Sequence, residues 1–332
     1  MRAIVCDEFG PFENMTIKDM PTPILAAGEV LVDVKAAGVS FAQSLTVAGK
    51  YQVKPALPFI PGVEVAGVVS AVSNSAKGVC VGDRVFAGVT YGGFAEQVIA
   101  HDYHCRSLPD GMDFAQGTLM VTSYPTSYAA LIWKARLHAG ETVLVHGAAG
   151  AVGMAAVQIA KAKGAQVIAT AGTDEKCAVA ERHGADLTIN YATSNFRDTV
   201  KDWTDGKGVD VVIDPVGGDI LYDSLRAMGR ESRLITLGYA SGDIPKPPIN
   251  LLLVKNMSII GLNFGTYMGW GPGDDGRGHV DKIDALHADL ASMFNADQLQ
   301  PEVSHRFPLD QFNDAMNVVL GRQSVGKVVL EP

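Results

Sequence analysis

The stretch TVLVHGAAGAVGMAAVQIAKAKG, residues 142–164, decides the fold. A valine-rich apolar run leads into Gly147, Gly150 and Gly153, and a helix-forming run follows them. The second glycine lets the backbone approach a pyrophosphate, and the third lets the helix pack closely on the strand. Free N–H groups at the start of such a helix attract anions. The pattern predicts a strand, a phosphate-binding turn and a helix. The alternative is a tight turn that binds no nucleotide.

The residues after this turn continue to alternate between apolar and amphipathic runs. We expect strands at 142–146, 166–170, 187–190, 209–213, 233–237 and 257–262, and helices at 152–163, 174–183, 195–203 and 220–228. Near-continuous apolar strands such as VDVVI are typical of parallel strands that helices cover on both faces. We therefore expect a doubly wound α/β domain over residues 124–265.

The rest of the chain has a different pattern of apolar and turn-forming residues. Short runs rich in Val and Ile at 3–6, 30–36, 63–72, 84–87 and 94–99 are separated by Gly, Pro, Asn and Asp, which predicts a β-rich domain at 1–123. Helices are expected at 113–120 and 123–136. Residues 266–332 hold a glycine-rich loop at 269–278, then two helices and two strands, and we expect them to return to the first domain.

Composition excludes several classes of protein. Of 332 residues, 47% are hydrophobic and 19% charged, which favours a globular chain with buried cores. A net charge of −9 without basic runs disfavours nucleic acid or an anionic membrane as the main partner. The four cysteines form no CxxC pair, and we see neither a signal peptide nor a membrane span. We therefore expect a cytoplasmic protein.

The second strand of the alternating region predicts which dinucleotide is bound. In NAD-binding proteins an acid about 20 residues beyond the turn accepts the ribose 2′-OH. Here the strand ends at Thr170-Ala171-Gly172-Thr173 without an acid. Thr173 and Lys176 can offer charge-assisted hydrogen bonds to a 2′-phosphate, so we expect NADPH rather than NADH. The alternative is that Lys176 is an ordinary solvated lysine.

Over nearly its whole length the chain resembles the zinc-independent quinone oxidoreductases, the zeta-crystallin group of the medium-chain dehydrogenase/reductase superfamily. The motifs that carry the resemblance are MRAIV (1–5), AAGVSFAQ (36–43), GKYQVKPALPFIPGVEVAGVV (49–69), VGDRV (81–85), YGGFAEQV (91–98), HGAAGAVGMAAVQIAKAKGA (146–165), GADLTINY (184–191), DPVGG (214–218) and GKVVL (326–330). The resemblance implies a β-rich, GroES-like catalytic domain joined to a Rossmann domain with a doubly wound parallel sheet.

The resemblance also implies a set of cofactor contacts. By position, the pyrophosphate would lie on Gly150, Ala151, Val152 and Gly153, and the adenosine phosphate on Gly172, Thr173, Lys176 and Tyr191. The nicotinamide would lie near Ser40, Thr126, Asn263, Phe264 and Gly265. Val216, Gly238 and Tyr239 would line the edge of the dinucleotide cleft, and Lys327 would close from the C-terminal strand. Ser40 departs from the asparagine that is common at its position in the group.

The positions that carry zinc ligands elsewhere in the superfamily are changed in this chain. Zinc alcohol dehydrogenases use a cysteine, a Gly-His-Glu segment and a further cysteine. Here Ser40 and the Gly-Val-Glu of residues 62–64 replace the first two, and residues 120–128 contain no cysteine. Zinc prefers thiolate and imidazole ligands, so Glu64 alone is insufficient and we expect no metal. We interpret His101-Asp102-Tyr103-His104-Cys105 as strand and loop, the alternative being a metal-binding cluster.

The expected chemistry is the reduction of an electron-poor acceptor. Hydride from NADPH can add to a quinone or another α,β-unsaturated carbonyl, and the protein then provides orientation and a proton. Tyr51 is the candidate catalytic proton donor, the alternative being that it only shapes the wall. Two other functions stay open: an enoyl-thioester reductase, and a non-catalytic NADPH-binding structural protein.

The last strand of the alternating region suggests how the chain associates. Residues 255–262 would form the final strand of the sheet and leave an apolar edge exposed. A second copy pairing there would cover the edge. The family resemblance implies the same homodimer.

Overall fold

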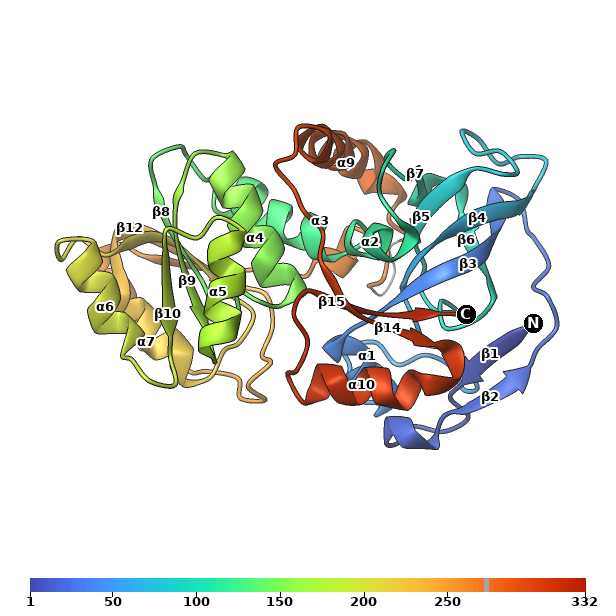
Figure 1. Ribbon diagram of the computed structural model, residues 1–332, viewed down its shortest axis with the longest axis horizontal. Coiled ribbons are helices and arrows are strands. Elements are labelled where there is room, and N and C mark those ends of the chain that lie inside the picture. The colour runs from blue at the N-terminus through green and yellow to red at the C-terminus, as the bar shows by residue number, and fades with distance from the viewer. Residues whose placement is uncertain (272–274) are drawn as a thin grey trace. The chain divides into compact units, whose positions relative to one another are not determined.

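The computed structural model describes residues 1–271 and 275–332, which form two compact units (Figure 1). Unit 1 comprises Met1–Thr122, Gly265–Ala288 and Pro301–Pro332, and unit 2 comprises Ser123–Phe264 and Asp289–Gln300. Residues 289–300 therefore group with unit 2, whereas the sequence-based boundaries put all of 266–332 with the first domain. Within the expected glycine-rich loop, residues 272–274 lie outside the described residues.

Unit 2 is built on a six-stranded sheet in which every neighbouring pair is parallel. Its order is β10 (Leu187–Asn190), β9 (Gln166–Ala171), β8 (Thr142–Val145), β11 (Val209–Asp214), β12 (Met228–Thr236) and β13 (Ser258–Gly261). This is the 3-2-1-4-5-6 order of a dinucleotide-binding fold, so the predicted doubly wound domain is confirmed.

Helices cover this sheet and bury its strands on both faces. They are α3 (Ser123–Tyr128), α4 (Ala151–Ala162), α5 (Asp174–Arg182), α6 (Phe196–Trp203), α7 (Asp219–Ala227) and α8 (Ile249–Lys255), with a π-helix, η3, at Ala129–Lys134. Successive side chains of a strand point to opposite faces. Val143, Leu144 and Val145 of β8 are all fully buried, so neither face of this strand meets solvent.

Unit 1 is built on a mainly antiparallel sheet. Its order is β14 (Val303–Pro308), β15 (Lys327–Glu331), β3 (Glu29–Val39), β4 (Glu64–Val72), β5 (Arg84–Gly88) and β7 (Cys105–Ser107), and β6 (Gln97–His101) also pairs with β3. β1 (Arg2–Val5) and β2 (Thr16–Asp19) form a separate antiparallel pair. The helices are α1 (Phe41–Val47), α2 (Phe114–Leu119) and α10 (Phe312–Leu320), and α9 (Val280–Asn295) begins here and ends in unit 2.

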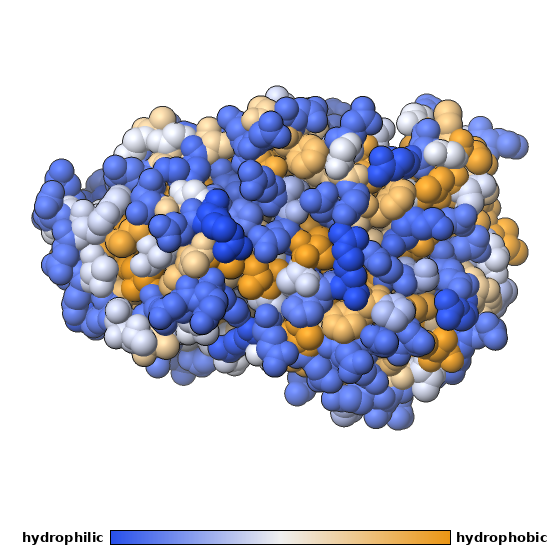
Figure 2. All heavy atoms as spheres, in the orientation of Figure 1, coloured by the Kyte–Doolittle hydropathy of each residue, from blue (hydrophilic) through white to orange (hydrophobic). Residues whose placement is uncertain are grey.

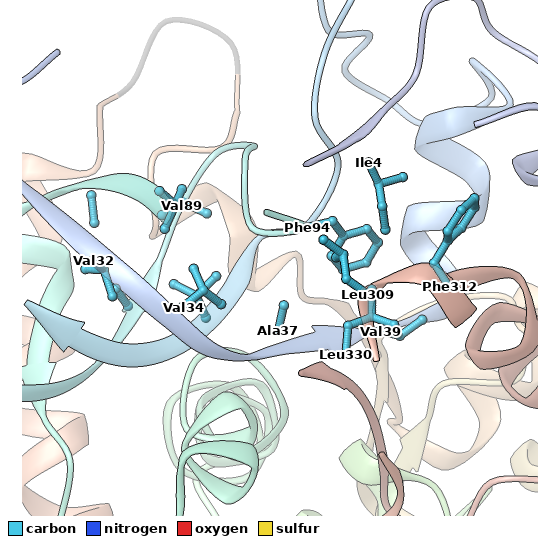
Figure 3. Packing of buried hydrophobic residues seen from close by; sticks show 14 of the residues in the cluster. Ile4, Val32, Val34, Ala37, Val39, Val89, Phe94, Leu309, Phe312 and Leu330 are labelled. Carbon is cyan, nitrogen blue, oxygen red and sulfur yellow. The ribbon is translucent and has the colours of Figure 1, made fainter. Parts of the chain in front are cut away.

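The core of unit 1 draws on both ends of the chain. Ile4, Phe94 and Leu330 are almost fully buried in one cluster with Val39, and Figure 3 shows them gathered beside strand β3. Residues more than 300 positions apart therefore share one hydrophobic core. This packing explains why the C-terminal residues return to the first unit.

Four short helices and strands were not expected from the sequence: β2, α1, β7 and α8. The side chains of α8 are mostly exposed, at 66% for Ile249, 79% for Leu253 and 69% for Val254. An apolar run on a surface gives no amphipathic period, so the sequence pattern did not mark a helix there. In the view of Figure 2, hydrophobic residues form small groups among hydrophilic ones. Within residues 1–271 and 275–332, no helix is both long and apolar enough to cross a membrane.

Candidate functional site

The glycine turn of unit 2 joins β8 to α4 with a geometry that only glycine permits. Gly147 has a φ of +60°, in the left-handed region that favours glycine. A Cβ on Gly153 would overlap the carbonyl group of Gly147 and lie 2.8 Å from the Cα of Ala148. No side-chain hydrogen bond caps α4 at Gly150, and the first N–H groups of a helix have no partner within the helix itself. The turn therefore fits a dinucleotide pyrophosphate.

A buried histidine directly precedes this turn and is hydrogen-bonded on both sides of its ring. His146 is fully buried, with Nδ1 at 2.8 Å from Thr170 Oγ1 and Nε2 at 2.8 Å from Ser224 Oγ. Ser224 donates its own hydroxyl proton to the Ile220 carbonyl, so Nε2–H donates to Ser224 and Nδ1 accepts from Thr170. Burial lowers the pKa of His146 to about 4. No sequence pattern assigned a role to His146, although it ends the strand expected at 142–146 and directly follows β8.

The adenosine end of the expected site is assembled where β9 and β10 finish. Thr173 caps α5, and its Oγ1 accepts the N–H of Lys176 at 3.3 Å. A Cβ on Gly172 would lie 2.7 Å from the hydroxyl of Tyr191, so these two residues are in close contact. Asn190 Nδ2 donates to the Asp174 carboxylate at 2.7 Å. The nearest acid is thus engaged by a neighbour.

The loops after β11 and β12 lie beside the glycine turn. A Cβ on Gly147 would lie 3.8 Å from Val216, and one on Gly217 would lie 2.7 Å from the ring of Tyr239. Gly238 immediately precedes that tyrosine. The N–H groups of Val216 and Gly217 both donate to Asp214 Oδ1, which fixes the loop. The structure therefore brings the predicted edge residues to the same end of the sheet as the pyrophosphate turn.

Thr126 lies on α3, next to a helix-to-helix contact. Ser127 donates its hydroxyl to the Val152 carbonyl at 2.7 Å, which joins α3 to the first turn of α4. Thr126 itself is half-buried. Asn263, Phe264 and Gly265 follow the last strand, and the Phe264 ring stacks on Trp133 with centroids 6.5 Å apart.

Ser40 stands at the start of α1 in unit 1, in a tightly bonded turn. Its backbone N–H donates to Gln43 Oε1 at 2.6 Å, and Gln43 Nε2 donates to the Gly38 carbonyl at 3.1 Å. Gln43 is only 4% exposed. The buried amide therefore fixes the backbone from Gly38 to Ser40.

Tyr51 follows α1 in an apolar part of unit 1. Its N–H donates to the Leu45 carbonyl at 3.1 Å, and its side chain is half-buried. Burial raises the pKa of the Tyr51 phenol, and the neighbouring Tyr91 has its own pKa raised by burial and by Tyr51. Tyr91 in turn packs edge-on against Phe59 at 5.5 Å between ring centroids. The Tyr51 phenol is thus neutral at pH 7.

Lys327 is buried, and its partner is Glu64. The Lys327 ammonium donates to Glu64 Oε2, and the hydroxyl of Thr122 donates to Glu64 Oε1. Lys327 was expected among the cofactor contacts, and that role stays a prediction. The zinc comparison singled out Glu64, but no sequence signal pointed to Lys327 or Thr122 as its partners.

The histidine-rich segment at 101–105 is partly buried in unit 1, and its buried residues are His104 and Cys105. Burial lowers the pKa of His104 to about 4 and raises the pKa of Cys105 to about 12. The His101 ring stacks on Tyr103 at 5.1 Å between centroids. Across the residues that the structure describes, no group of three or more His, Cys, Asp or Glu side chains could hold a metal ion.

Two family models match the chain. Residues 26–110 match the alcohol dehydrogenase GroES-like domain, and residues 151–273 match the zinc-binding dehydrogenase family. The first match lies within unit 1, and the described part of the second lies almost entirely within unit 2.

Similar proteins and solved structures agree with these matches. The chain is 38% identical to a quinone oxidoreductase-like protein 2 homolog of Nematostella vectensis, over 99% of this chain and 88% of that protein. The Escherichia coli quinone oxidoreductase complexed with NADPH superposes with a TM-score of 0.90 at 27% identity, covering 100% of each chain. The quinone oxidoreductase of Thermus thermophilus, also solved with NADPH, has a TM-score of 0.85 at 31% identity over 100% of each chain.

Proposed function

The chain belongs to the zinc-independent quinone oxidoreductases of the medium-chain dehydrogenase/reductase superfamily, and from this premise we propose that it is an NADPH-dependent reductase of quinones or other α,β-unsaturated carbonyls. The observation that carries the proposal is the glycine turn of unit 2 together with the acid-free end of β9. Both features suit a phosphorylated dinucleotide.

The residues of unit 2 hold and orient the cofactor in this proposal. NADPH, when bound, supplies the hydride. The pyrophosphate is bound by backbone N–H groups and closely approached by the backbone of Gly150, Ala151, Val152 and Gly153. Gly172, Thr173, Lys176 and Tyr191 receive the adenosine phosphate. The dinucleotide is flanked by Val216, Gly238 and Tyr239. The nicotinamide is received by Thr126, Asn263 and Phe264 of unit 2 and by Ser40 and Gly265 of unit 1.

Tyr51 supplies the proton in this proposal. A phenol with a raised pKa stays protonated at neutral pH, so it can donate to an oxygen that gains charge. The half-buried position in apolar surroundings suits a donor that solvent does not compete with. The alternative, a tyrosine that only shapes the wall, predicts normal turnover in a Tyr51→Phe variant.

The proposed partners are a small-molecule acceptor and a second copy of the chain. β13 is the last strand of the unit 2 sheet, and Ser258 and Gly261 at its two ends are exposed. A second β13 pairing there would satisfy its open backbone edge. Sedimentation at micromolar concentration should give a dimer, and a monomer would contradict this assembly. The four free cysteines suit a reducing compartment such as the cytoplasm.

Oxidation of NADPH at 340 nm with a panel of acceptors tests the proposed function. We expect steady turnover with 1,4-benzoquinone and 9,10-phenanthrenequinone, and much slower oxidation of NADH. Preference for a crotonyl thioester would instead indicate an enoyl-thioester reductase. Tight NADPH binding without turnover on any acceptor would indicate the non-catalytic, structural alternative.

A further inference from the structure

Glu64 and Lys327 meet over a glycine in the unit 1 sheet. Strand β3 lies between β15 and β4, with Val39 paired to Val328 and Ala37 paired to Val65. Glu64 and Lys327 begin the two flanking strands and reach across β3 from opposite sides. A Cβ on Gly38 would overlap both the Glu64 carboxylate and the Lys327 Cε. The two charges can therefore meet only because residue 38 has no side chain.

The pair is almost completely withdrawn from solvent. Glu64 is 1% exposed and Lys327 is 3% exposed. Burying two charges is unfavourable even when they pair, and apolar residues of the same size often give a more stable protein. A buried ion pair is therefore weak evidence for stability.

The carboxylate of the pair has a hydrogen-bond donor for each oxygen, whereas the ammonium has fewer acceptors among the described residues than it has N–H groups. Both Glu64 oxygens have a donor, one from Thr122 and one from Lys327. An ammonium group has three N–H donors. Within residues 1–271 and 275–332, Glu64 Oε2 is the one hydrogen-bond acceptor of the Lys327 ammonium. Buried donors usually find an acceptor, so the ammonium has donor capacity left for an additional oxygen.

The position of the ammonium matters for the proposed reaction. Lys327 precedes Val328, which pairs with Val39, so it lies beside the next residue, Ser40. Glu64 ends the segment 62–64. These are the two segments where zinc-dependent members of the superfamily carry metal ligands. In this chain Lys327 brings an ammonium group to the same strand ends.

We propose that Lys327, held in place by Glu64, is a catalytic cation for the reduction. It stabilises the negative charge that develops on the carbonyl oxygen of the acceptor, which is the role a metal cation could play at these strand ends. The inference rests on the proposed function, and the chemical class of its ligand is a carbonyl oxygen that becomes an oxyanion. Preorganised charges of this kind are often a large contribution to catalysis.

The step balances without any change in Lys327. A hydride from NADPH adds to one oxygen of a quinone or to the β-carbon of an enone, so a C–H bond of the reduced nicotinamide breaks and NADP⁺ is left. A new bond to hydrogen forms on the acceptor, and the displaced π electron pair moves onto the conjugated carbonyl oxygen. That oxygen then takes a proton, from Tyr51 or from water, to give the hydroquinone or, through the enol, the saturated ketone.

A neutral replacement of the whole pair provides the test. Lys327→Met alone would leave a buried, unpaired carboxylate and could fail to fold, so the decisive variant is the double change Glu64→Gln with Lys327→Met. The matched control removes an exposed ion pair of the same unit, Asp7→Asn with Lys18→Met. Circular dichroism and melting temperature report folding. Turnover is measured with 1,4-benzoquinone and with the less electron-poor tetramethyl-1,4-benzoquinone.

We expect the neutral double variant to fold, and its turnover is compared with the wild type at saturating NADPH because Lys327 is also an expected cofactor contact. Its turnover of the tetramethyl quinone should fall about 10²-fold, as when one oxyanion donor is removed. Turnover of 1,4-benzoquinone should fall less, because an acceptor that tolerates charge better depends less on the fixed cation. Lys327→Arg should recover part of the loss, and the control should resemble the wild type.

Two outcomes would overturn the inference while the wild type reduces quinones. One is a folded neutral variant with wild-type turnover of both acceptors. The other is an equal loss for both acceptors, which indicates a purely structural pair. A wild type that binds NADPH but reduces no acceptor would instead contradict the proposed function, and this inference with it.

Discussion

The glycine turn of unit 2 and the Glu64–Lys327 pair of unit 1 are built in opposite ways. The turn is made of backbone, from seven consecutive residues, and its geometry follows from glycine spacing. The pair is made of side chains that are 263 positions apart in the chain, joined across a third strand at Gly38. A site of the first kind can be predicted from neighbouring residues in the sequence. A site of the second kind can be recognised only when the pairing of the strands is known.

The largest expected effect is at Gly153 in the turn. Gly153→Val would force a side chain into the Gly147 carbonyl, so the turn has to open. We expect loss of measurable NADPH binding by fluorescence titration, and a lower free energy of unfolding by about 1–3 kcal/mol from overpacking. Gly278→Ala, at a position with open space, is the control. Normal NADPH affinity in Gly153→Val would remove the turn from the site.

Tyr51→Phe tests the proton donor in unit 1. The change deletes one hydroxyl and keeps the ring, so packing against its neighbours should survive. If the phenol donates the proton, turnover should fall about 10²-fold while the KM for NADPH stays the same. Tyr91→Phe, in the same apolar surroundings, is the matched control. Near-normal turnover in Tyr51→Phe would assign the residue to packing.

Lys176→Ala tests the coenzyme preference of unit 2. The KM for NADPH should rise about 10-fold, which corresponds to about 1.4 kcal/mol, because one charge-assisted contact to the 2′-phosphate is lost. The KM for NADH should hardly change, since NADH has no phosphate there. Initial rates with both coenzymes give the comparison. Equal effects on the two would contradict the assignment.

The last prediction concerns stability in mild acid, and it compares the two units. Burial lowers the pKa of His146 in unit 2 and of His104 in unit 1 to about 4, from an ordinary 6.5. Between these values the unfolded chain binds more protons than the folded one. The free energy of unfolding should therefore fall as pH drops from 6.5 towards 4, by up to about 1.4 kcal/mol per pH unit for each histidine.

Urea unfolding at pH 7.5, 6.0 and 5.0 measures this decline. His146→Gln should flatten the pH dependence of unit 2, and His104→Gln that of unit 1, whatever each change does to stability at pH 7.5. If neither variant alters the slope, the two imidazoles are not the groups that take up protons on unfolding.

The sequence predicted the features whose physics is local. The apolar runs gave the strands of the parallel sheet, and the glycine spacing gave the turn between β8 and α4. It did not reveal α8, because its exposed Ile249, Leu253 and Val254 show no buried face. It did not reveal that Lys327 pairs with Glu64, because the register of β15, β3 and β4 is set by the folded sheet. His146 was also missed, since its partners Thr170 and Ser224 come from other elements.

The residue at position 38 predicts whether a homologous sequence can form the Glu64–Lys327 ion pair. Any side chain at this position would push the carboxylate and the ammonium apart, so positions 38, 64 and 327 should covary among homologues. Where position 38 carries alanine or anything larger, the acid or the lysine should be replaced as well. Three aligned columns would therefore separate relatives that keep an internal cation from those that must stabilise the product oxygen by other means.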